Sequence, residues 1–147
     1  LDRAIQGVIT FLKWEVQKPG IHVEFLPGGQ SHKVMANKIQ IEQVLINLMR
    51  NSLEAIEHVK TTGGRIVIQS RLLPNDMIQV TVTDNGPGIN ANMADKMFDQ
   101  FQTSKKAGMG IGLSLSRSII EIHGGKLWLD KSRQNGASFS FELPISE

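Results

Sequence analysis

Two asparagines one helical turn apart are the first residues in this sequence whose type and spacing suggest chemistry. They belong to a polar stripe beside an apolar helix face, made of Gln40, Gln43, Asn47, Asn51, Glu54 and His58. Asparagine is a poor mid-helix residue because its amide competes with the backbone for hydrogen bonds. An amide oxygen on a rigid helix suits Mg²⁺, which takes few protein ligands and is completed by phosphates and water. The alternative is a face that only meets solvent.

A carboxylate at the end of an expected strand is the second candidate. Residues 78–83 lead to Asp84, and Gly86-Pro87-Gly88 then turns the chain tightly. A carboxylate fixed there would accept a hydrogen bond from the exocyclic amine of a ligand, and the glycines would let the backbone approach a flat ring. The alternative is an ordinary Asp-Asn-Gly turn.

The third candidate is a glycine-rich segment before an apolar, helix-like run. Gly108, Gly110 and Gly112 follow the hydroxyls and cations of residues 103–106 in the sequence TSKKAGMGIGLS. Backbone N–H groups at a helix N-terminus favour a phosphate. The G-x-G-x-G spacing fits neither the dinucleotide fingerprint nor the P-loop, so the segment alone does not distinguish a phosphate site from a flexible loop.

The elements that must position these candidates follow from the hydrophobic pattern. We expect helices at 2–19, 37–59, 91–101 and 113–123, strands at 21–27, 65–72, 77–84, 126–130 and 137–144, a short partner strand at 32–36 and a loop at 102–112. Phe98 and Phe101 are three apart, and on spacing alone they are core anchors. This order predicts an α+β fold: a two-layer sandwich with one mixed, mostly antiparallel sheet of about five strands and three main helices on one face.

Composition restricts the class of protein. The chain has 147 residues, 40% hydrophobic and 20% charged, which is typical of one globular domain. No apolar run reaches the roughly 20 residues of a membrane span, and no secretory signal opens the chain. The absence of cysteine fits a reducing compartment, and a net charge of +2 gives no reason to expect nucleic acid as a partner. Because the chain begins in helical character without a methionine, we expect residues 1–147 to be one domain of a longer protein.

Taken in order, the motifs resemble the ATP-binding catalytic domain of sensor histidine kinases. The helix with Asn47 and Asn51 is followed by DNGPGI, then by MFDQFQTSK and then by GMGIGLSLSRSIIEIHGG. The wider group is the GHKL superfamily, which includes gyrase-type topoisomerases, a heat-shock chaperone and mismatch-repair ATPases. Within the kinases, the motifs are most similar to the branch of oxygen- and nitrogen-responsive sensors. The resemblance extends from the first helix to GASFSFELP and implies the Bergerat ATP-binding fold.

The resemblance implies a role for each matching residue. Asn51 would ligate Mg²⁺, and Asn47 would line the metal and phosphate site. Lys105 would reach the phosphates of ATP, and Asp84 would bind the adenine amino group. The pocket would be completed by Gly86, Gly88, Ile89, Phe101, Gly108, Gly110, Ile111, Gly112, Leu113 and Ser138.

The same resemblance implies a lid over the nucleotide. Phe98 and Phe101 would anchor it, while Gly108, Gly110 and Gly112 would hinge it and offer N–H groups to the phosphates. The segment between Phe101 and Gly108 is short, so the lid would make few contacts without nucleotide.

Two positions on the asparagine helix bear on the reaction. Many kinases carry a basic residue where this chain has Glu54, so a phosphate contact is not expected there. The hydrolases of the superfamily place a glutamate where this chain has Asn47, and an amide cannot serve as their general base near neutral pH. The sequence therefore favours phosphoryl transfer, which needs mostly positioning and charge stabilisation, over ATP hydrolysis.

The acceptor of the phosphoryl group is expected outside this chain. None of its 4 histidines, which are His22, His32, His58 and His123, lies in the context of a kinase acceptor helix. The resemblance implies an upstream helical domain that carries the acceptor and dimerises the parent, and a response regulator as the downstream partner. We expect the fragment to be a cytoplasmic monomer that binds ATP and Mg²⁺, makes no direct membrane contact and does not autophosphorylate alone, whether or not the parent is membrane-anchored.

Three alternatives remain open at this point. A GHKL ATPase would release phosphate steadily, against which Asn47 argues. An anti-sigma-type serine kinase would share the pocket but act on a serine of a partner protein. A decayed, nucleotide-independent binding module is disfavoured by the intact glycine motifs together with Asn51 and Asp84.

Overall fold

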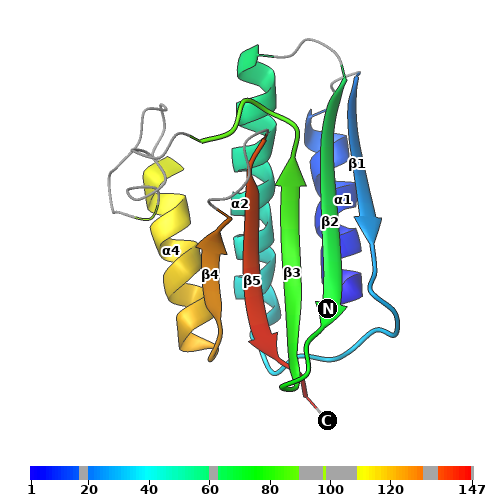
Figure 1. The fold of residues 1–147 in the computed structure, drawn as a ribbon, viewed down its shortest axis with the longest axis vertical. Coiled ribbons are helices and arrows are strands. Elements are labelled where there is room, and N and C mark those ends of the chain that lie inside the picture. The colour runs from blue at the N-terminus through cyan, green and yellow to red at the C-terminus, as the bar shows by residue number, and fades with distance from the viewer. Residues whose placement is uncertain (17–19, 60–62, 90–97, 99–108, 131–135, 147) are drawn as a thin grey trace.

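The computed structural model describes residues 1–16, 20–59, 63–89, 98, 109–130 and 136–146. In this part of the chain, five strands form one sheet and three helices cover one of its faces (Figure 1). The helices are α1 (Asp2–Val16), α2 (Lys38–Val59) and α4 (Met109–Ile122). The strands are β1 (Ile21–Leu26), β2 (Gly64–Leu72), β3 (Met77–Asp84), β4 (Lys126–Leu129) and β5 (Ser138–Pro144). The predicted α+β sandwich is therefore confirmed.

The sheet is mixed, in the order β1-β2-β3-β5-β4. β1 pairs with β2 in parallel, with α2 in the connection between them, and every other pairing is antiparallel. The predicted β2–β3 hairpin is present, and Asp76 in its turn has a φ of 59°. In the β3–β5 pairing Thr83 lies opposite Ser138, so the end of β3 and the start of β5 meet at one edge of the sheet.

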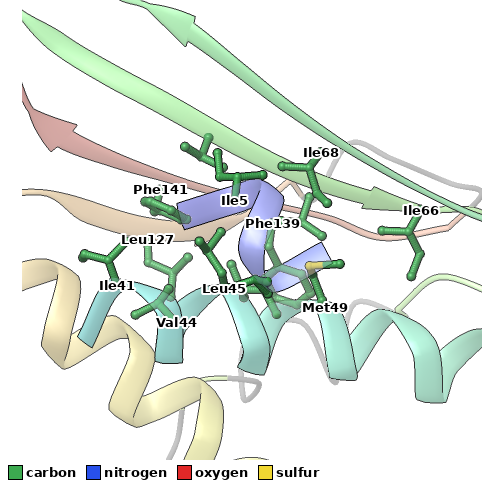
Figure 2. Close-up of a cluster of buried hydrophobic side chains, with 14 of the residues drawn as sticks. Ile5, Ile41, Val44, Leu45, Met49, Ile66, Ile68, Leu127, Phe139 and Phe141 are labelled. Atoms are coloured by element: carbon green, nitrogen blue, oxygen red, sulfur yellow. The ribbon is translucent and has the colours of Figure 1, made fainter. Parts of the chain in front are cut away.

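The hydrophobic core lies between the sheet and the helices (Figure 2). Each helix contributes the face that its periodicity predicts, and β3 alternates between buried and half-buried residues along its length. Burial of each large aliphatic or aromatic side chain contributes roughly 1.5–3 kcal/mol. The largest contributors are Phe139, Phe141, Ile5, Leu45, Leu48, Met49, Ile56, Ile66, Ile68, Ile120 and Leu143.

The start of α2 and the end of α4 are fixed to each other. The Asn37 side chain caps α2, since its Oδ1 accepts a hydrogen bond from Gln40 N (3.1 Å). His123, after α4, accepts a hydrogen bond from Asn37 N at Nε2 (3.1 Å) and contacts Ile119 O through Nδ1 (2.7 Å). Gly124, with a φ of 86°, then ends the helix as a left-handed cap. His123 therefore has a structural role.

Some expected elements differ from the structure. The partner strand predicted at 32–36 was wrong: the segment makes one isolated bridge, Val34 to Ile145. Its carbonyls also accept hydrogen bonds from Ser146 N at Lys33 O (2.7 Å) and from the N-terminal amine of Leu1 at His32 O (3.5 Å). An isolated bridge does not make a ladder. The helix expected at 91–101 and the end of the helix expected at 2–19 lie outside the described residues, apart from Phe98.

No helix in the described ranges combines the length and the apolar character needed to cross a membrane.

Ser52 in α2 carries a hydroxyl whose removal we expect to stabilise the protein. The side chain is 1% exposed, and its Oγ has no hydrogen-bond partner among the described residues. A buried donor without a partner costs about 1–3 kcal/mol, and alanine is the better helix former. We therefore expect Ser52→Ala to raise the free energy of unfolding by about 1 kcal/mol in chemical denaturation. A loss of 1 kcal/mol would show instead that the hydroxyl is bonded in solution.

Candidate functional site

The Asp84 side chain is held at the end of β3 by backbone donors. It is 3% exposed, and its Oδ1 accepts hydrogen bonds from Gly86 N (2.9 Å) and from Ala137 N (3.2 Å). Within the described part of the chain, the other oxygen, Oδ2, receives no hydrogen bond. A buried carboxylate with one fixed and one open oxygen is arranged to accept a hydrogen bond from a ligand.

The turn after Asp84 brings the backbone close to α2. A side chain on Gly86 would place its Cβ 3.1 Å from Asp84 Oδ1 and 3.4 Å from Ala55. Glycine therefore allows the turn to lie this close to α2. Gly88 has a φ of 84°, in the left-handed region that glycine adopts readily. Ile89 is half-buried and packs against the core. Asp84, Gly86 and Gly88 thus form one compact corner beside α2.

Asn85 stabilises this corner, and the sequence reasoning did not assign it a role. Its Oδ1 accepts a hydrogen bond from Arg65 N (2.8 Å), and its Nδ2 donates to Gly63 O (2.9 Å). The backbone N–H of Asn85 also donates to Arg65 O (3.2 Å). These bonds fasten the turn to the start of β2. The Asn-Gly turn signal was present in the sequence, but the partner strand was not identifiable from it.

Ser138 and Ala137 occupy opposite faces of the sheet at this corner. Ala137 O accepts a hydrogen bond from Asp84 N (2.9 Å), which places Ala137 directly opposite Asp84. Ser138 instead lies opposite Thr83, and the two hydroxyl oxygens are 3.0 Å apart. Because side chains alternate along a strand, the Ser138 hydroxyl lies on the face away from the Asp84 carboxylate. The structure therefore places Ala137 beside the carboxylate and the Ser138 hydroxyl on the opposite face of the sheet.

The asparagine stripe of α2 is partly buried, which differs from a simple solvated face. Asn51 is 6% exposed, Asn47 is half-buried, and Gln40 and Gln43 at the start of the stripe are exposed. No group of three or more histidine, cysteine, aspartate or glutamate side chains in the described ranges is arranged to hold a metal ion. An amide oxygen is one of the ligand types that Mg²⁺ accepts together with phosphates and water.

Asn47 joins α2 to α4 through its amide. Its Nδ2 donates to Ser116 Oγ (3.0 Å) and to Gly112 O (3.2 Å), while its Oδ1 accepts from Gln43 Nε2 (2.9 Å). Leu113 beside this contact is 4% exposed. In this conformation every polar atom of the Asn47 amide is bonded within the protein.

The glycine segment continues into α4 earlier than the sequence indicates. We predicted a loop at 102–112, which is wrong for residues 109–112 because α4 begins at Met109. Gly110 and Gly112 therefore lie in its first turns. The bond from Asn47 to Gly112 O and the burial of Leu113 are tertiary contacts that offset the low helix propensity of glycine.

Phe98 packs where the sequence places an aromatic anchor. Its ring meets the Phe139 ring edge-to-face, with centroids 6.1 Å apart and an interplanar angle of 81°. The Arg117 guanidinium of α4 lies over the Phe98 ring, 5.0 Å from the centroid. Phe98 thus connects β5 to the middle of α4. Of the other predicted site residues, Phe101, Lys105 and Gly108 lie outside the described residues, and Ile111 is described by its backbone alone.

Comparison with known proteins identifies the family of this chain. The family model for histidine kinase-, DNA gyrase B- and HSP90-like ATPases matches residues 36–147. The chain is similar to the sensor protein FixL of Bradyrhizobium diazoefficiens, with 43% identity over 131 residues, or 89% of this chain and 26% of FixL. It therefore spans about a quarter of the length of that relative.

Solved structures share the fold across nearly the whole chain. The catalytic domain of histidine kinase ThkA, in a nucleotide-free form, is 36% identical with a TM-score of 0.85, over 98% of this chain and 91% of that domain. ThkA in complex with the response regulator protein TrrA is 34% identical with a TM-score of 0.82, over 99% of this chain and 40% of that chain.

Proposed function

This chain belongs to the family of histidine kinase-, DNA gyrase B- and HSP90-like ATPases, as the ATP-binding catalytic domain of a sensor histidine kinase. From that premise we propose that it transfers the γ-phosphoryl group of ATP to a histidine on an upstream helical domain of the same protein. In this step an imidazole nitrogen forms a bond to phosphorus, and the phosphorus–oxygen bond to ADP breaks. ADP leaves with the electron pair, and the proton of the other ring nitrogen passes to solvent.

The Asp84 carboxylate is the observation that carries the nucleotide assignment. Gly86 N and Ala137 N fix its Oδ1, which leaves Oδ2 to accept a hydrogen bond from the adenine amino group. Glycine at position 86 lets the turn after Asp84 pack closely against α2. These contacts favour adenine over a base that carries a carbonyl oxygen at the same position, because two acceptors would then face each other.

Asn51 is the residue that we propose as the protein ligand of Mg²⁺. Its amide is 6% exposed, on the face of α2 that also carries Asn47. When bound, Mg²⁺ would neutralise charge on the β- and γ-phosphates. Lys105 and the glycines of the lid are proposed to contact the same phosphates.

The chemistry of Asn47 favours transfer over hydrolysis. A hydrolase needs a general base to activate water, and an amide has no usable proton affinity near neutral pH. The bonds of Asn47 to Ser116 and Gly112 support a role in positioning α4 relative to α2. Phosphoryl transfer to a positioned nucleophile depends mainly on such positioning.

The partners follow from the family. The structure of ThkA with TrrA is a complex of a histidine kinase with a response regulator protein, and we propose a response regulator as the downstream partner here. We propose that residues 1–147 form one cytoplasmic, monomeric domain and that dimerisation belongs to other parts of the parent protein. The upstream domain would present its histidine to the bound nucleotide.

Thermal unfolding measured at increasing concentrations of ATP with Mg²⁺ tests the proposed function. We expect the melting temperature to rise with ATP concentration, corresponding to about 2.7 kcal/mol at a hundred times Kd, without steady release of phosphate. Addition of the acceptor domain should then yield an acid-labile phosphohistidine. No rise at millimolar ATP would overturn the proposal. Steady phosphate release would favour the ATPase alternative, and transfer to a partner's serine would favour the anti-sigma type.

Gly112 offers a separate test of the lid. Its φ is not in the left-handed region, and an added Cβ would lie 3.6 Å from Asn47 Cγ, an ordinary contact. Gly112→Ala should therefore strengthen α4 by about 1 kcal/mol without ligand. If this turn must approach phosphates or move with the lid, the same change should weaken ATP binding by about tenfold, or about 1.4 kcal/mol.

The matched control for Gly112→Ala is Gly7→Ala in α1. An added Cβ at Gly7 meets nothing within 4 Å, so helix propensity should rise by a similar amount away from the site. Melting temperature and calorimetric titration with Mg·ATP measure both effects. Wild-type affinity in Gly112→Ala would contradict a hinge or phosphate contact at this residue.

A further inference from the structure

A chain of hydrogen bonds connects solvent to the buried side of α4 through Asn47. It begins at Gln43, an exposed residue whose Nε2 donates to Asn47 Oδ1 (2.9 Å). It ends at Ser116, whose side chain is 0% exposed and whose Oγ accepts from Asn47 Nδ2 (3.0 Å). The same Nδ2 donates to Gly112 O (3.2 Å) in the first turns of α4. These bonds are the Gln43–Asn47–Ser116 link.

The link permits only one orientation of the Asn47 amide. The carbonyl of Gly112 is an acceptor and cannot donate, so the NH₂ group of Asn47 must face α4. A flipped amide would place Oδ1 against that carbonyl. Gln43 stabilises the observed orientation from the other side by donating to Oδ1.

Ser116 is the buried end of the link, and its contact contrasts with that of Ser52. Both hydroxyls are buried in helices, but Ser52 Oγ has no partner among the described residues, whereas Ser116 Oγ is bonded to Asn47. Ser116 therefore makes a directional connection between α2 and α4. It lies one helical turn after Gly112, so the connection fixes the N-terminal part of α4 on the same helix that carries Asn51.

We propose that Ser116 and Gln43 are positioning residues for the phosphates of ATP. Acting through Asn47, they hold the first turns of α4 in a fixed place relative to Asn51, so that the groups proposed to contact the phosphates are aligned before the nucleotide binds. This inference rests on the proposed function. Neither residue is assigned a contact with adenine, which is proposed to bind at the corner formed by Asp84, Gly86 and Gly88 (the Asp84 corner).

Two ligands separate this role from a general effect on folding. Mg·ATP would contact both the Asp84 corner and the residues proposed to bind the phosphates, whereas adenosine would contact the Asp84 corner alone. One lost hydrogen bond at the link should weaken Mg·ATP by about tenfold in Ser116→Ala, and about threefold in Gln43→Ala, with adenosine affinity within twofold of wild type. Both affinities can be measured by titration in amide chemical-shift spectra.

Matched variants are available on the same helices. Ser118 is exposed on α4, and Gln40 is exposed on α2 one turn before Gln43. Ser118→Ala and Gln40→Ala should leave both affinities unchanged. Ser116→Thr retains the hydroxyl and should recover most of the affinity for Mg·ATP. Because Gln43 is exposed, Gln43→Ala keeps the test valid even if a change at the buried Ser116 unfolds the chain.

The outcomes distinguish this inference from the function on which it rests. If the wild-type chain does not bind Mg·ATP, the proposed function fails first. If the wild type binds and the Ser116→Ala and Gln43→Ala variants bind Mg·ATP equally well, the positioning role is overturned and the function stands. Equal losses for Mg·ATP and adenosine would also overturn it, because they would indicate a general effect on the fold.

Discussion

Replacing Asp84 with asparagine is expected to weaken ATP binding by about a hundredfold while the domain stays folded. The two backbone donors at Gly86 and Ala137 both point to Oδ1, so the asparagine must keep its oxygen there. Its NH₂ group then takes the place of Oδ2 and meets the adenine amino group donor to donor. A buried polar pair that is mismatched in this way loses its hydrogen bond and leaves both groups unpaired.

A second nucleotide makes the Asp84 prediction more specific. Inosine triphosphate carries an acceptor where ATP carries the amino group, so Asp84→Asn should lose ATP but retain or gain affinity for the inosine nucleotide. Asp76→Asn, an exposed change at the opposite end of β3, should alter neither affinity. Calorimetric titration with both nucleotides measures the difference. An ATP affinity within threefold of wild type in Asp84→Asn would rule out the assigned adenine contact.

Gly136→Ala is expected to have the largest effect on stability. An added Cβ would lie 1.9 Å from Asp84 O and 2.9 Å from Asp84 C, and Gly136 has a φ of 79°. The end of β3 must therefore move away, or residue 136 must change conformation. The overlap and the strained φ together should cost about 3 kcal/mol or more. Because the displaced group is Asp84, ATP binding should be lost with stability.

Gly63→Ala separates the two causes. Gly63 has nearly the same conformation, with a φ of 77°, but an added Cβ there meets nothing within 4 Å. This variant should cost only the left-handed conformation of alanine, about 1–2 kcal/mol. Chemical denaturation of both variants gives the comparison. Similar losses in the two would show that close packing against Asp84 is not what requires Gly136.

The sequence predicted most of the fold because its periodic signals are local. The apolar face of α2 repeats at helical spacing, and β2 and β3 alternate on either side of a Pro-Asn-Asp turn. The start of α4 was misplaced for the opposite reason. Glycines at 110 and 112 look like a loop, and the tertiary contacts that offset their low helix propensity, the bond from Asn47 to Gly112 O and the burial of Leu113, are not visible in the sequence.

The candidate site was predictable to a similar degree. Asp84 was identified from its place at a strand end, and the structure confirms that it ends β3. Its neighbour across the sheet was not predictable, because one residue of register decides whether Ala137 or Ser138 faces the carboxylate. The Gln43–Asn47–Ser116 link likewise joins residues that are far apart in the chain, and no local pattern indicates such a contact.

The parallel pairing of β1 with β2 divides the chain into parts that differ in the entropy of loop closure. The β2–β3 hairpin closes a short turn, whereas Ile21 reaches Gly64 only after α2 has been enclosed between them. The β2–β3 hairpin should therefore form first. The β3–β5 pairing joins Thr83 to Ser138, which are further apart in the chain than Ile21 and Gly64, so it also closes a long loop. The corner formed by Asp84, Gly86 and Gly88 thus depends on a strand pairing that should form after the hairpin.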